Sequence, residues 1–437
     1  MTTAVLPREH HLYLDGMGDE LGPFATFGAQ FFLVVAPIFL FRVVDAEVLP
    51  DLAGPALLAG TLGVLALAPR LVIHRIPVSG LALLMVAWMG LSVMWSGNTA
   101  ATVTLLKRDM PVLIGLMLVI GMASFRHIVA ALIWSIRISV LVTIIAVAAS
   151  PSARVHIDPT GAAPDLAGWH GLFPHKNIMT PFLVFGILTV LTFDRSTILK
   201  WATLAGAGVL LVGSDSVTGL SSVFLAISVW VWLQLYRNLD LRGSSVFVVS
   251  SVSMALFGAV AVAASLSTIT GASGKDLTFT GRTFIWSAAL TLWKERPVWG
   301  WGADGVLSAD PLTPRTAQAW REIGFDVPHA HNGTLDLGVQ FGIVGVLIFV
   351  ALFATTLISG LSILRDRPEL GAWVGSVMIV QLYMSMSEPV FVRFGWLGVL
   401  LMLRLMMMRK YAVELSTGIG LADRVRHSRR WGVTENV

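Results

Sequence analysis

Long apolar stretches separated by short polar segments make up most of this chain of 437 residues. A helix needs about 20 predominantly apolar residues to cross the hydrocarbon core of a bilayer. The fourth stretch is the least regular, because Lys107, Arg108 and Asp109 stand at its start. The pattern predicts an all-α, polytopic membrane protein with about twelve transmembrane helices. The predicted spans lie near residues 25–43, 52–70, 76–95, 106–124, 127–149, 177–193, 198–214, 217–236, 244–268, 333–360, 370–387 and 390–409.

Two longer polar segments interrupt the apolar pattern, at residues 150–176 and 269–332. In the second segment a helix is predicted over residues 281–296, where the next residue, a proline, ends it. A shorter helix is predicted over residues 314–324, with Thr313 as its N-cap and a glycine as its terminator. We therefore expect the second segment to be a folded helical cap on the outer side of the membrane rather than a linker.

The composition excludes several classes of protein. Hydrophobic residues make up 55% of the chain and charged residues only 13%, against roughly 25% charged in a typical soluble domain. A soluble enzyme, a disordered protein and a nucleic-acid-binding module are excluded on this ground. The chain has no cysteine, which also excludes disulfides, cysteine-ligated zinc, iron–sulfur clusters and thiol catalysis.

The distribution of lysine and arginine predicts the topology. These residues concentrate in alternate loops and in the C-terminal tail, which places both termini in the cytoplasm. The start of the chain is mixed polar and acidic, so we expect the first apolar stretch to be a retained helix rather than a cleaved signal peptide. The predicted parts are a cytoplasmic segment (1–24), nine helices with an outer loop at 150–176 (25–268), a periplasmic cap (269–332), three helices (333–409) and a basic cytoplasmic tail (410–437).

The first group of residues suited to chemistry is Trp-His-Gly-Leu-Phe-Pro-His-Lys-Asn at 169–177, just before the sixth span. Asn177 is expected to be the N-cap of that span, so the free N–H groups and the positive dipole end of the helix face outward. His175 and Lys176 stand beside this end, and together these features indicate an anion site. The alternative interpretation is a capped helix whose polar residues reach the membrane surface.

The second group is Pro-His-Ala-His-Asn-Gly at 328–333, just before the tenth span. Asn332 is expected to cap that helix, and His331 stands beside its dipole end. A neutral histidine can take a proton from a hydroxyl, whereas a protonated one can bind phosphate. The alternation of His329 and His331 is also compatible with a metal ion, although no third ligand is evident nearby. An ordinary pair of surface histidines is the remaining alternative.

The third group begins at Arg282, whose planar guanidinium suits phosphate or diphosphate oxygens. Trp286 follows one helical turn later and offers an aromatic face to a sugar ring. Five of the fifteen tryptophans lie in the cap segment, and an interfacial aromatic belt is the alternative explanation. Arg315 and Arg321 share the segment and are further candidate substrate contacts, with surface salt bridges as the alternative.

The ordered set of motifs resembles the O-antigen ligase and polysaccharide polymerase superfamily of bacterial inner-membrane proteins. The resemblance covers about residues 165–400, and the His-Lys-Asn element is most similar to the exopolysaccharide polymerase branch. The motifs are Trp-x-Gly-x-Phe-x-His-Lys-Asn at 169–177, Gly-Arg-x-x-x-Trp at 281–286, Pro-Val-Trp-Gly-Trp-Gly at 297–302, His-Asn at 331–332 and Gly-Ile-Val-Gly at 342–345.

The resemblance implies a metal-independent glycosyltransferase that needs no cofactor and takes its donor, an oligosaccharide on undecaprenyl diphosphate, at the outer face of the membrane. Carried over by position, Arg282 holds the diphosphate, and His331 is the catalytic base or a ligand of the leaving group. The bilayer is a partner, a chain-length regulator or export complex is a possible further one, and nucleic acid is not. The implied substrate contacts are Lys176, His175, Asn177, Asn332, His329, Trp286, Arg315 and Arg321.

Within this class, polymerisation of lipid-linked repeat units is the favoured function. O-antigen ligation to a lipid A core is the first alternative. The alternative from another class is a flippase for lipid-linked oligosaccharides, which would also suit twelve spans. Transporters place their charged sites near the bilayer midplane, whereas the candidate residues here are expected on one side of the membrane.

Overall fold

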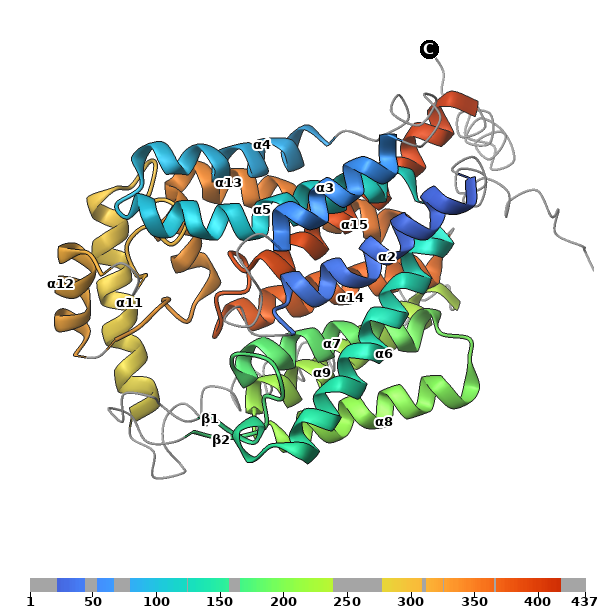
Figure 1. The fold of residues 1–437 in the computed structure, drawn as a ribbon, viewed down its shortest axis with the longest axis horizontal. Helices are drawn as coiled ribbons and strands as arrows, with labels where there is room; N and C mark the ends of the chain where they lie inside the picture. Colours follow the sequence, from blue (N-terminus) through green and yellow to red (C-terminus); the bar gives the residue numbers. More distant parts are fainter. Residues whose placement is uncertain are drawn as a thin grey trace, which may run out of the picture.

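The computed structural model describes residues 22–43, 53–66, 79–123, 125–156, 166–238, 277–308, 312–324, 326–364 and 367–417. These residues form thirteen α-helices, and only one pair of two-residue strands accompanies them (Figure 1). The all-α prediction is therefore confirmed for this part of the chain. The helices are α2 (Gly22–Leu40), α3 (Ala53–Ala66), α4 (Gly80–Leu91), α5 (Thr99–Met122), α6 (Phe125–Ala149), α7 (Lys176–Phe193), α8 (Thr197–Gly213), α9 (Val217–Asn238), α11 (Leu277–Glu295), α12 (Pro314–Ile323), α13 (Gly333–Ser362), α14 (Pro368–Ser385) and α15 (Phe394–Thr417).

The apolar helices make this a multi-pass membrane protein. Four of the described helices, α6, α7, α9 and α13, are long and apolar enough to cross a bilayer, and α2, α4, α8 and α15 contain shorter apolar segments. Eleven of the twelve predicted spans coincide with a described helix. The ninth, predicted at 244–268, lies outside the described residues, so the total of twelve spans stays a prediction.

The fourth span differs most from its prediction. Helix α5 begins at Thr99, seven residues early, because the side chain of Asn98 caps it by accepting a hydrogen bond from the backbone N–H of Ala101 at 3.2 Å. The charged residues therefore lie inside the helix rather than at its start. There Asp109 is only 3% exposed, and its carboxylate accepts a hydrogen bond from the guanidinium of Arg108 at 2.9 Å. Pairing with a cation makes this buried charge tolerable.

Aromatic side chains form the centre of the bundle. The ring of Phe41, just after α2, contacts Phe182 on α7 and Trp396 on α15, with centroids 5.1 and 6.0 Å apart. Phe185 on α7 lies 6.1 Å from Trp373 on α14. Edge-on and tilted aromatic pairs contribute about 0.5–1.5 kcal/mol each beyond their burial. This core fixes α7, α14 and α15 relative to one another, and the loops at their ends carry the candidate site.

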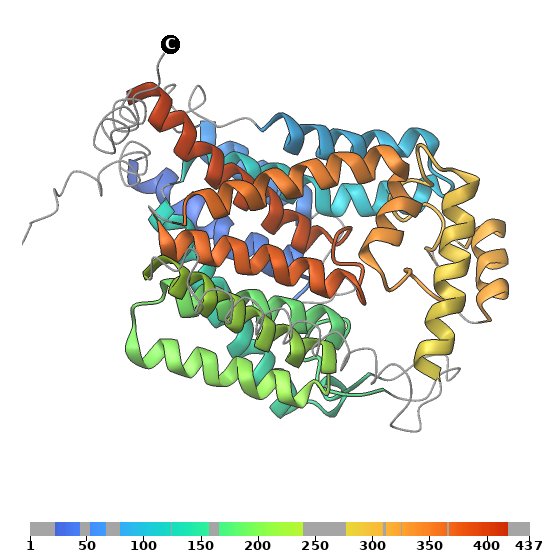
Figure 2. The same ribbon diagram turned by 180° about the vertical axis from the view of Figure 1, so that it is seen from behind.

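The predicted cap is a second, smaller folding unit at one end of the bundle. In Figures 1 and 2, α11 crosses that end and α12 lies on its outer side. Ile285, Ala289 and Leu292 of α11 are buried with Ala319 and Ile323 of α12 in a hydrophobic cluster separate from the main core. Helix α11 thus packs one apolar face against α12.

The boundaries of the cap helices match the sequence signals closely. Helix α11 ends at Glu295 as expected, although it begins four residues before the predicted start. Helix α12 begins at Pro314, and the hydroxyl of Thr313 accepts a hydrogen bond from the N–H of Thr316 at 3.2 Å. Gly324 ends the helix in the left-handed region, with φ at 97°, which costs least in glycine.

The tenth span is broken where one continuous helix was predicted. Within α13, Gly342 has φ 62° and ψ −169°, a conformation that essentially only glycine adopts. Residues 297–302 of the cap fill the break. The N–H groups of Trp301 and Gly302 donate to carbonyls of the first half of α13 at 2.8 Å, and Ile343 N–H donates back to the carbonyl of Pro297 at 2.8 Å. The backbone groups freed by the break are therefore satisfied inside the protein, as a membrane requires.

The segment at 150–176 contains the only strands among the described residues, β1 (Val155–His156) and β2 (Leu166–Ala167), which pair antiparallel. No strand was predicted here, since two-residue strands are too short to show an alternating pattern. After β2, the N–H of Trp169 donates to the last carbonyl of α8 at 2.8 Å. This contact ties the segment to the bundle just before α7 begins.

Candidate functional site

The loop that enters α13 is held from two sides. The indole N–H of Trp286 on α11 donates to the carbonyl of Ala330 at 3.1 Å. The N–H of Ala330 donates to the carboxylate of Asp336, which is 1% exposed, at 2.9 Å. Asn332 caps α13 as predicted, since its side-chain oxygen accepts from the N–H groups of Thr334 and Leu335 at 3.0 and 3.1 Å. Helix α11 of the cap unit and the first turn of α13 therefore hold this loop from two sides.

Loss of the side chain of Asn332, the N-cap of α13, is expected to lower the stability of the protein. Asn332→Ala loses both hydrogen bonds and is expected to lower the free energy of unfolding by about 1 kcal/mol. Asn332→Ser keeps a capping oxygen and is expected to recover most of that loss. Thermal unfolding of the purified variants in detergent measures the effect, and equal melting temperatures for wild type and Asn332→Ala would contradict it.

His331 stands at the most strained position of this loop. Its φ is +48°, in the left-handed region that costs a residue with a Cβ roughly 1–2 kcal/mol. The residue is 27% exposed at its side chain, while its Nδ1 is buried without a hydrogen-bond partner in the described structure. Such an outlier supports a functional hypothesis, because the surrounding contacts hold the ring in place against the strain.

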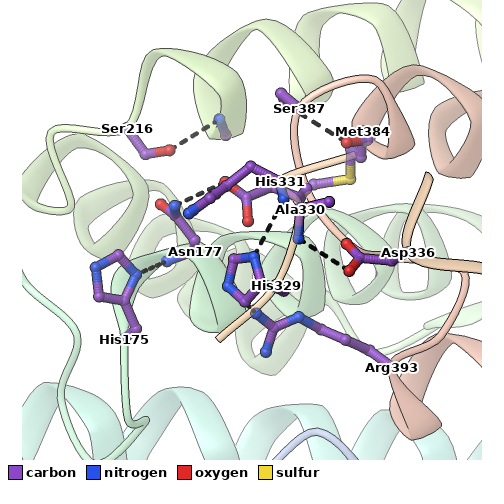
Figure 3. A network of polar contacts seen from close by, with 12 residues as sticks. His175, Asn177, Ser216, His329, Ala330, His331, Asp336, Met384, Ser387 and Arg393 are labelled. Atoms are coloured by element: carbon purple, nitrogen blue, oxygen red, sulfur yellow. Dashed lines mark hydrogen bonds and ion pairs between the residues drawn. The ribbon is translucent and has the colours of Figure 1, made fainter. Parts of the chain in front are cut away.

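His329 lies against His331 and is kept neutral. The two rings meet edge to face with centroids 4.1 Å apart, and a guanidinium nitrogen of Arg393 lies 3.4 Å from His329 Nε2 (Figure 3). Burial lowers the pKa of His329 well below its usual value, and the neighbouring His331 ring and Arg393 guanidinium lower it further. The N–H of His331 also points at His329 Nδ1, at 3.3 Å. A neutral imidazole has one acceptor nitrogen, so it satisfies one of these two donors at a time.

The N-terminus of α7 forms the second side of the site, with one correction to the sequence prediction. The N-cap is His175, whose Nδ1 accepts a hydrogen bond from the N–H of Asn177 at 3.1 Å. Asn177 was predicted to be the cap, but it lies in the first turn, and its side-chain NH₂ donates to Glu388 at 2.7 Å. The predicted cap was therefore two residues too late, and the prediction missed the partner of Asn177.

Lys176 lies beside the segment that precedes α7. Gly168 has φ +129°, and a Cβ there would come within 2.9 Å of the Lys176 Nζ and 2.3 Å of the Ser214 carbonyl oxygen. A glycine at this position therefore leaves room for the lysine chain next to the turn between α8 and α9. The structure places Lys176 at the positive end of α7, as predicted.

Glu388 joins the two helix starts. It follows α14 in a turn fixed by its own N–H, which donates to the carbonyl of Met384 at 2.9 Å. The carboxylate is 4% exposed and lies 3.9 Å from His331 Nδ1. Burial by itself would raise the pKa of Glu388, but the neighbouring His331, Arg393 and Arg282 outweigh it and lower that pKa. Glu388 is thus an ionised carboxylate at the centre of a cationic cluster.

Arg282 and Arg393 supply the positive charge of this cluster. Arg282 is half-buried on α11, and burial lowers its pKa, an effect that the charge of Glu388 partly offsets. Burial also lowers the pKa of Arg393, whose Nε has no hydrogen-bond partner within the described residues. Both guanidinium groups stay charged at neutral pH. Neither Glu388 nor Arg393 was predicted from the sequence to have a role.

The remaining predicted contacts fall outside this cluster. Arg315 makes a bidentate ion pair with Glu295, at 2.6 and 3.0 Å, and approaches Glu322 at 3.9 Å. It therefore joins α12 to α11. Arg321 is exposed on α12, which lies on the side of α11 away from the bundle (Figure 1). The structure brings together His175, Asn177, Arg282, Trp286, His329, His331 and Asn332, and it does not bring Arg315 or Arg321 to them.

Comparison with known proteins supports the class that the motifs predicted. Residues 202–350 match the Wzy_C family, which is described as O-antigen ligase. The predicted resemblance is therefore confirmed. The matched region includes Arg282 and His331, starts after Lys176 and ends before Glu388.

A curated relative narrows the comparison. The chain is 27% identical over 157 residues to the exopolysaccharide production protein ExoQ of Rhizobium meliloti strain 1021. The match covers 31% of this chain and 34% of the relative, so it spans only about a third of that protein's length. It indicates distant homology to a protein of exopolysaccharide production.

Proposed function

We propose that this protein is a glycosyltransferase that polymerises oligosaccharide repeat units carried on undecaprenyl diphosphate, at the periplasmic face of the bacterial inner membrane. The observation that supports this most is the position of the buried Glu388, which lies 3.9 Å from His331 Nδ1 and within electrostatic reach of Arg282. Arg282 and His331 come from different elements, α11 and the loop before α13. They lie at the end of the bundle that the cap covers.

The charge of the cluster suits the departing diphosphate. Glycosyl transfer builds negative charge on this leaving group while the bond to the sugar breaks. Arg282 and the positive dipole ends of α7 and α13 are cationic features fixed before the substrate arrives. Preorganised groups of this kind stabilise the transition state because they need no rearrangement during the reaction.

The acceptor requires a base, and His331 is the residue we assign to this role. The hydroxyl of an incoming sugar gives up a proton as its oxygen attacks the anomeric carbon. A general base contributes roughly 10²–10⁴-fold to such a step. His329 is held neutral by burial and neighbouring charge, but both of its ring nitrogens face donors of the protein. The side chain of His331 is more exposed than that of His329, which makes His331 the better candidate for the base.

The polymerase and ligase functions differ in the acceptor. Homology to a protein of exopolysaccharide production favours a second lipid-linked unit as acceptor, whereas the description of the matched family names ligation. The candidate site lies at the capped end of the bundle and not halfway along it, which favours a transferase over the flippase alternative.

Arg282 provides the test of this function. Purified protein in liposomes is supplied with a synthetic oligosaccharide on undecaprenyl diphosphate, and the products are separated by length. Wild type is expected to form dimers and longer chains. Arg282→Ala is expected to lower kcat/KM by roughly 10–100-fold, since a hydrogen bond to a charged group contributes about 1.5–3 kcal/mol.

The matched control is Lys294→Ala, which removes an exposed cation from the same helix and is expected to leave transfer unchanged. Equal losses in the two variants would mean that overall positive charge matters, and not a contact of Arg282. A wild-type protein that joins the glycan only to a lipid A core acceptor would be a ligase. One that makes no glycosidic bond with either acceptor would refute the proposed function.

A further inference from the structure

Glu388 is a buried carboxylate that has few hydrogen bonds. Its Oε1 accepts one from Asn177 at 2.7 Å, and its Oε2 is buried without a partner in the described structure. An ionised carboxylate costs free energy to bury unless its oxygens are well paired. The turn after α14 nevertheless fixes Glu388 at this place, with hydrogen bonds from its own N–H to Met384 and from Val390 N–H to its carbonyl.

The atom facing this carboxylate is also unsatisfied. His331 Nδ1 is buried, has no hydrogen-bond partner in the described residues, and lies 3.9 Å from Glu388 Oε1. This separation is about 1 Å longer than a hydrogen bond between charged groups. Catalytic contacts are often long before the substrate binds and shorten in the reacting complex. A buried ring nitrogen without a partner therefore lies a short gap from a buried carboxylate that has one oxygen, Oε2, without a partner.

We propose that Glu388 is a positioning residue that acts through His331. The inference rests on the proposed function. The carboxylate accepts the Nδ1–H of the neutral ring, which selects that tautomer and leaves the lone pair on Nε2. Because Nδ1 is buried, Nε2 is the ring nitrogen that can meet a substrate. A ring without this partner would carry its proton on either nitrogen and would rotate more freely.

The acceptor hydroxyl gives its proton to His331 Nε2 while its oxygen bonds to the anomeric carbon of the donor. The bond from that carbon to the diphosphate oxygen breaks, and the diphosphate leaves with the electron pair. The imidazolium that forms carries a positive charge beside the carboxylate of Glu388, which stabilises it. The ring then returns its extra proton to water.

The charges around His331 decide how strongly the carboxylate matters. Glu388 is the closest anion, at 3.9 Å, and the other neighbours are mostly cationic, so removal of the Glu388 charge leaves the protonated ring in a repulsive environment. The charged and titratable groups of the packed elements are Glu388 and Arg393 from the turn between α14 and α15, Arg282 from α11, His175 and Lys176 at the start of α7, Asp304 from the loop between α11 and α12, and His329 and Asp336 beside His331 itself.

The test is a pH–rate profile of the reconstituted full-length protein with the synthetic lipid-linked donor. Glu388→Gln keeps the shape and the contact with Asn177 but removes the charge. We expect kcat to fall by roughly 10²–10⁴-fold, as when a base loses its orienting carboxylate, with KM for the donor changed by less than about threefold. The acidic limb of the profile is expected to move to lower pH by about one unit or more. Glu388→Asp is expected to recover part of kcat and to keep the wild-type limb.

The matched control is Glu369→Gln, which makes the same change at an exposed ion pair with Arg195 and is expected to behave as wild type. In a His331→Ala background, Glu388→Gln is expected to cause no further loss of activity, because each change alone disables the same pair of residues.

An active Glu388→Gln protein with a wild-type kcat and pH profile would overturn the inference. So would a Glu388→Asp protein that folds and shows the same loss as Glu388→Gln without any shift of the limb, since that result describes a structural role. Absence of transfer by wild type would refute the proposed function instead, so the two failures are distinguishable.

Discussion

His331→Ala is expected to lower the rate of glycosyl transfer by roughly 10²–10⁴-fold, which is the usual contribution of a general base. Binding of the lipid-linked donor is expected to change little, because the donor's diphosphate charge is met mainly by Arg282 and the helix ends. Alanine keeps a Cβ at this left-handed position, with φ at +48°, so the backbone strain is unchanged and the stability is expected to stay close to that of wild type. Single-turnover kinetics and donor binding, measured on the same preparation, separate these effects.

The control for this experiment is His127→Ala, which removes a histidine at the start of α6, away from the cap. A second comparison uses pH. If His331 is only a ligand of the leaving diphosphate, its loss will weaken donor binding. In that case the pH dependence of kcat will keep the limbs that it has in wild type. A His331→Ala protein that transfers sugar at the wild-type rate would remove this residue from the chemistry.

Local signals predicted the cap helices and one of the two helix starts at the site. Thr313, the proline after it and Gly324 define α12, and Asn332 defines the start of α13. These predictions succeed because capping depends on residues within one turn of each other, which the sequence shows directly. The face that α11 buries follows from local periodicity in the same way.

The start of α7 shows where local signals stop being sufficient. Both His175 and Asn177 carry a side-chain acceptor suited to an N-cap, and asparagine is the stronger choice by preference. The structure uses His175, because the amide of Asn177 donates to Glu388 across 211 positions of sequence. A contact between residues so far apart in sequence thus decides which of two suitable residues is the N-cap. The sequence around residue 177 carries no sign of that contact.

The same reason explains why Glu388 and Arg393 received no role from the sequence. They lie in a short turn between two apolar helices, where a surface pair is the ordinary expectation. The packing of α7, α13 and α14 buries them, and only then do the charges of Arg282, His329 and His331 become their neighbours. The matched family region ends before this turn, so the comparison did not indicate them either.

Gly342 links the tenth span to the site through the cap. Its break in α13 receives residues 297–302, and the indole N–H of Trp301 in that loop donates to the carbonyl of Leu292 on α11 at 2.8 Å. Helix α11 also carries Arg282 and Trp286. The sequence motifs at 297–302 and 342–345 are therefore two halves of one contact. The sequence contained both, but their pairing depends on a backbone conformation that a continuous apolar stretch does not reveal.

Gly342→Ala is accordingly expected to destabilise the capped end of the protein. A Cβ at this position would lie 2.1 Å from the carbonyl oxygen of Val298 and 2.6 Å from the nitrogen of Trp299. The backbone strain costs about 1–3 kcal/mol, and loss of the hydrogen bonds that fill the break costs about 1 kcal/mol each. We expect a clear fall in melting temperature and a loss of transfer activity, because α11 no longer holds Arg282 in place.

The control is Gly208→Ala on α8, where a Cβ meets nothing within 4 Å. This change is expected to be neutral or slightly stabilising. Wild-type melting and activity in Gly342→Ala would show that the break does not anchor the cap.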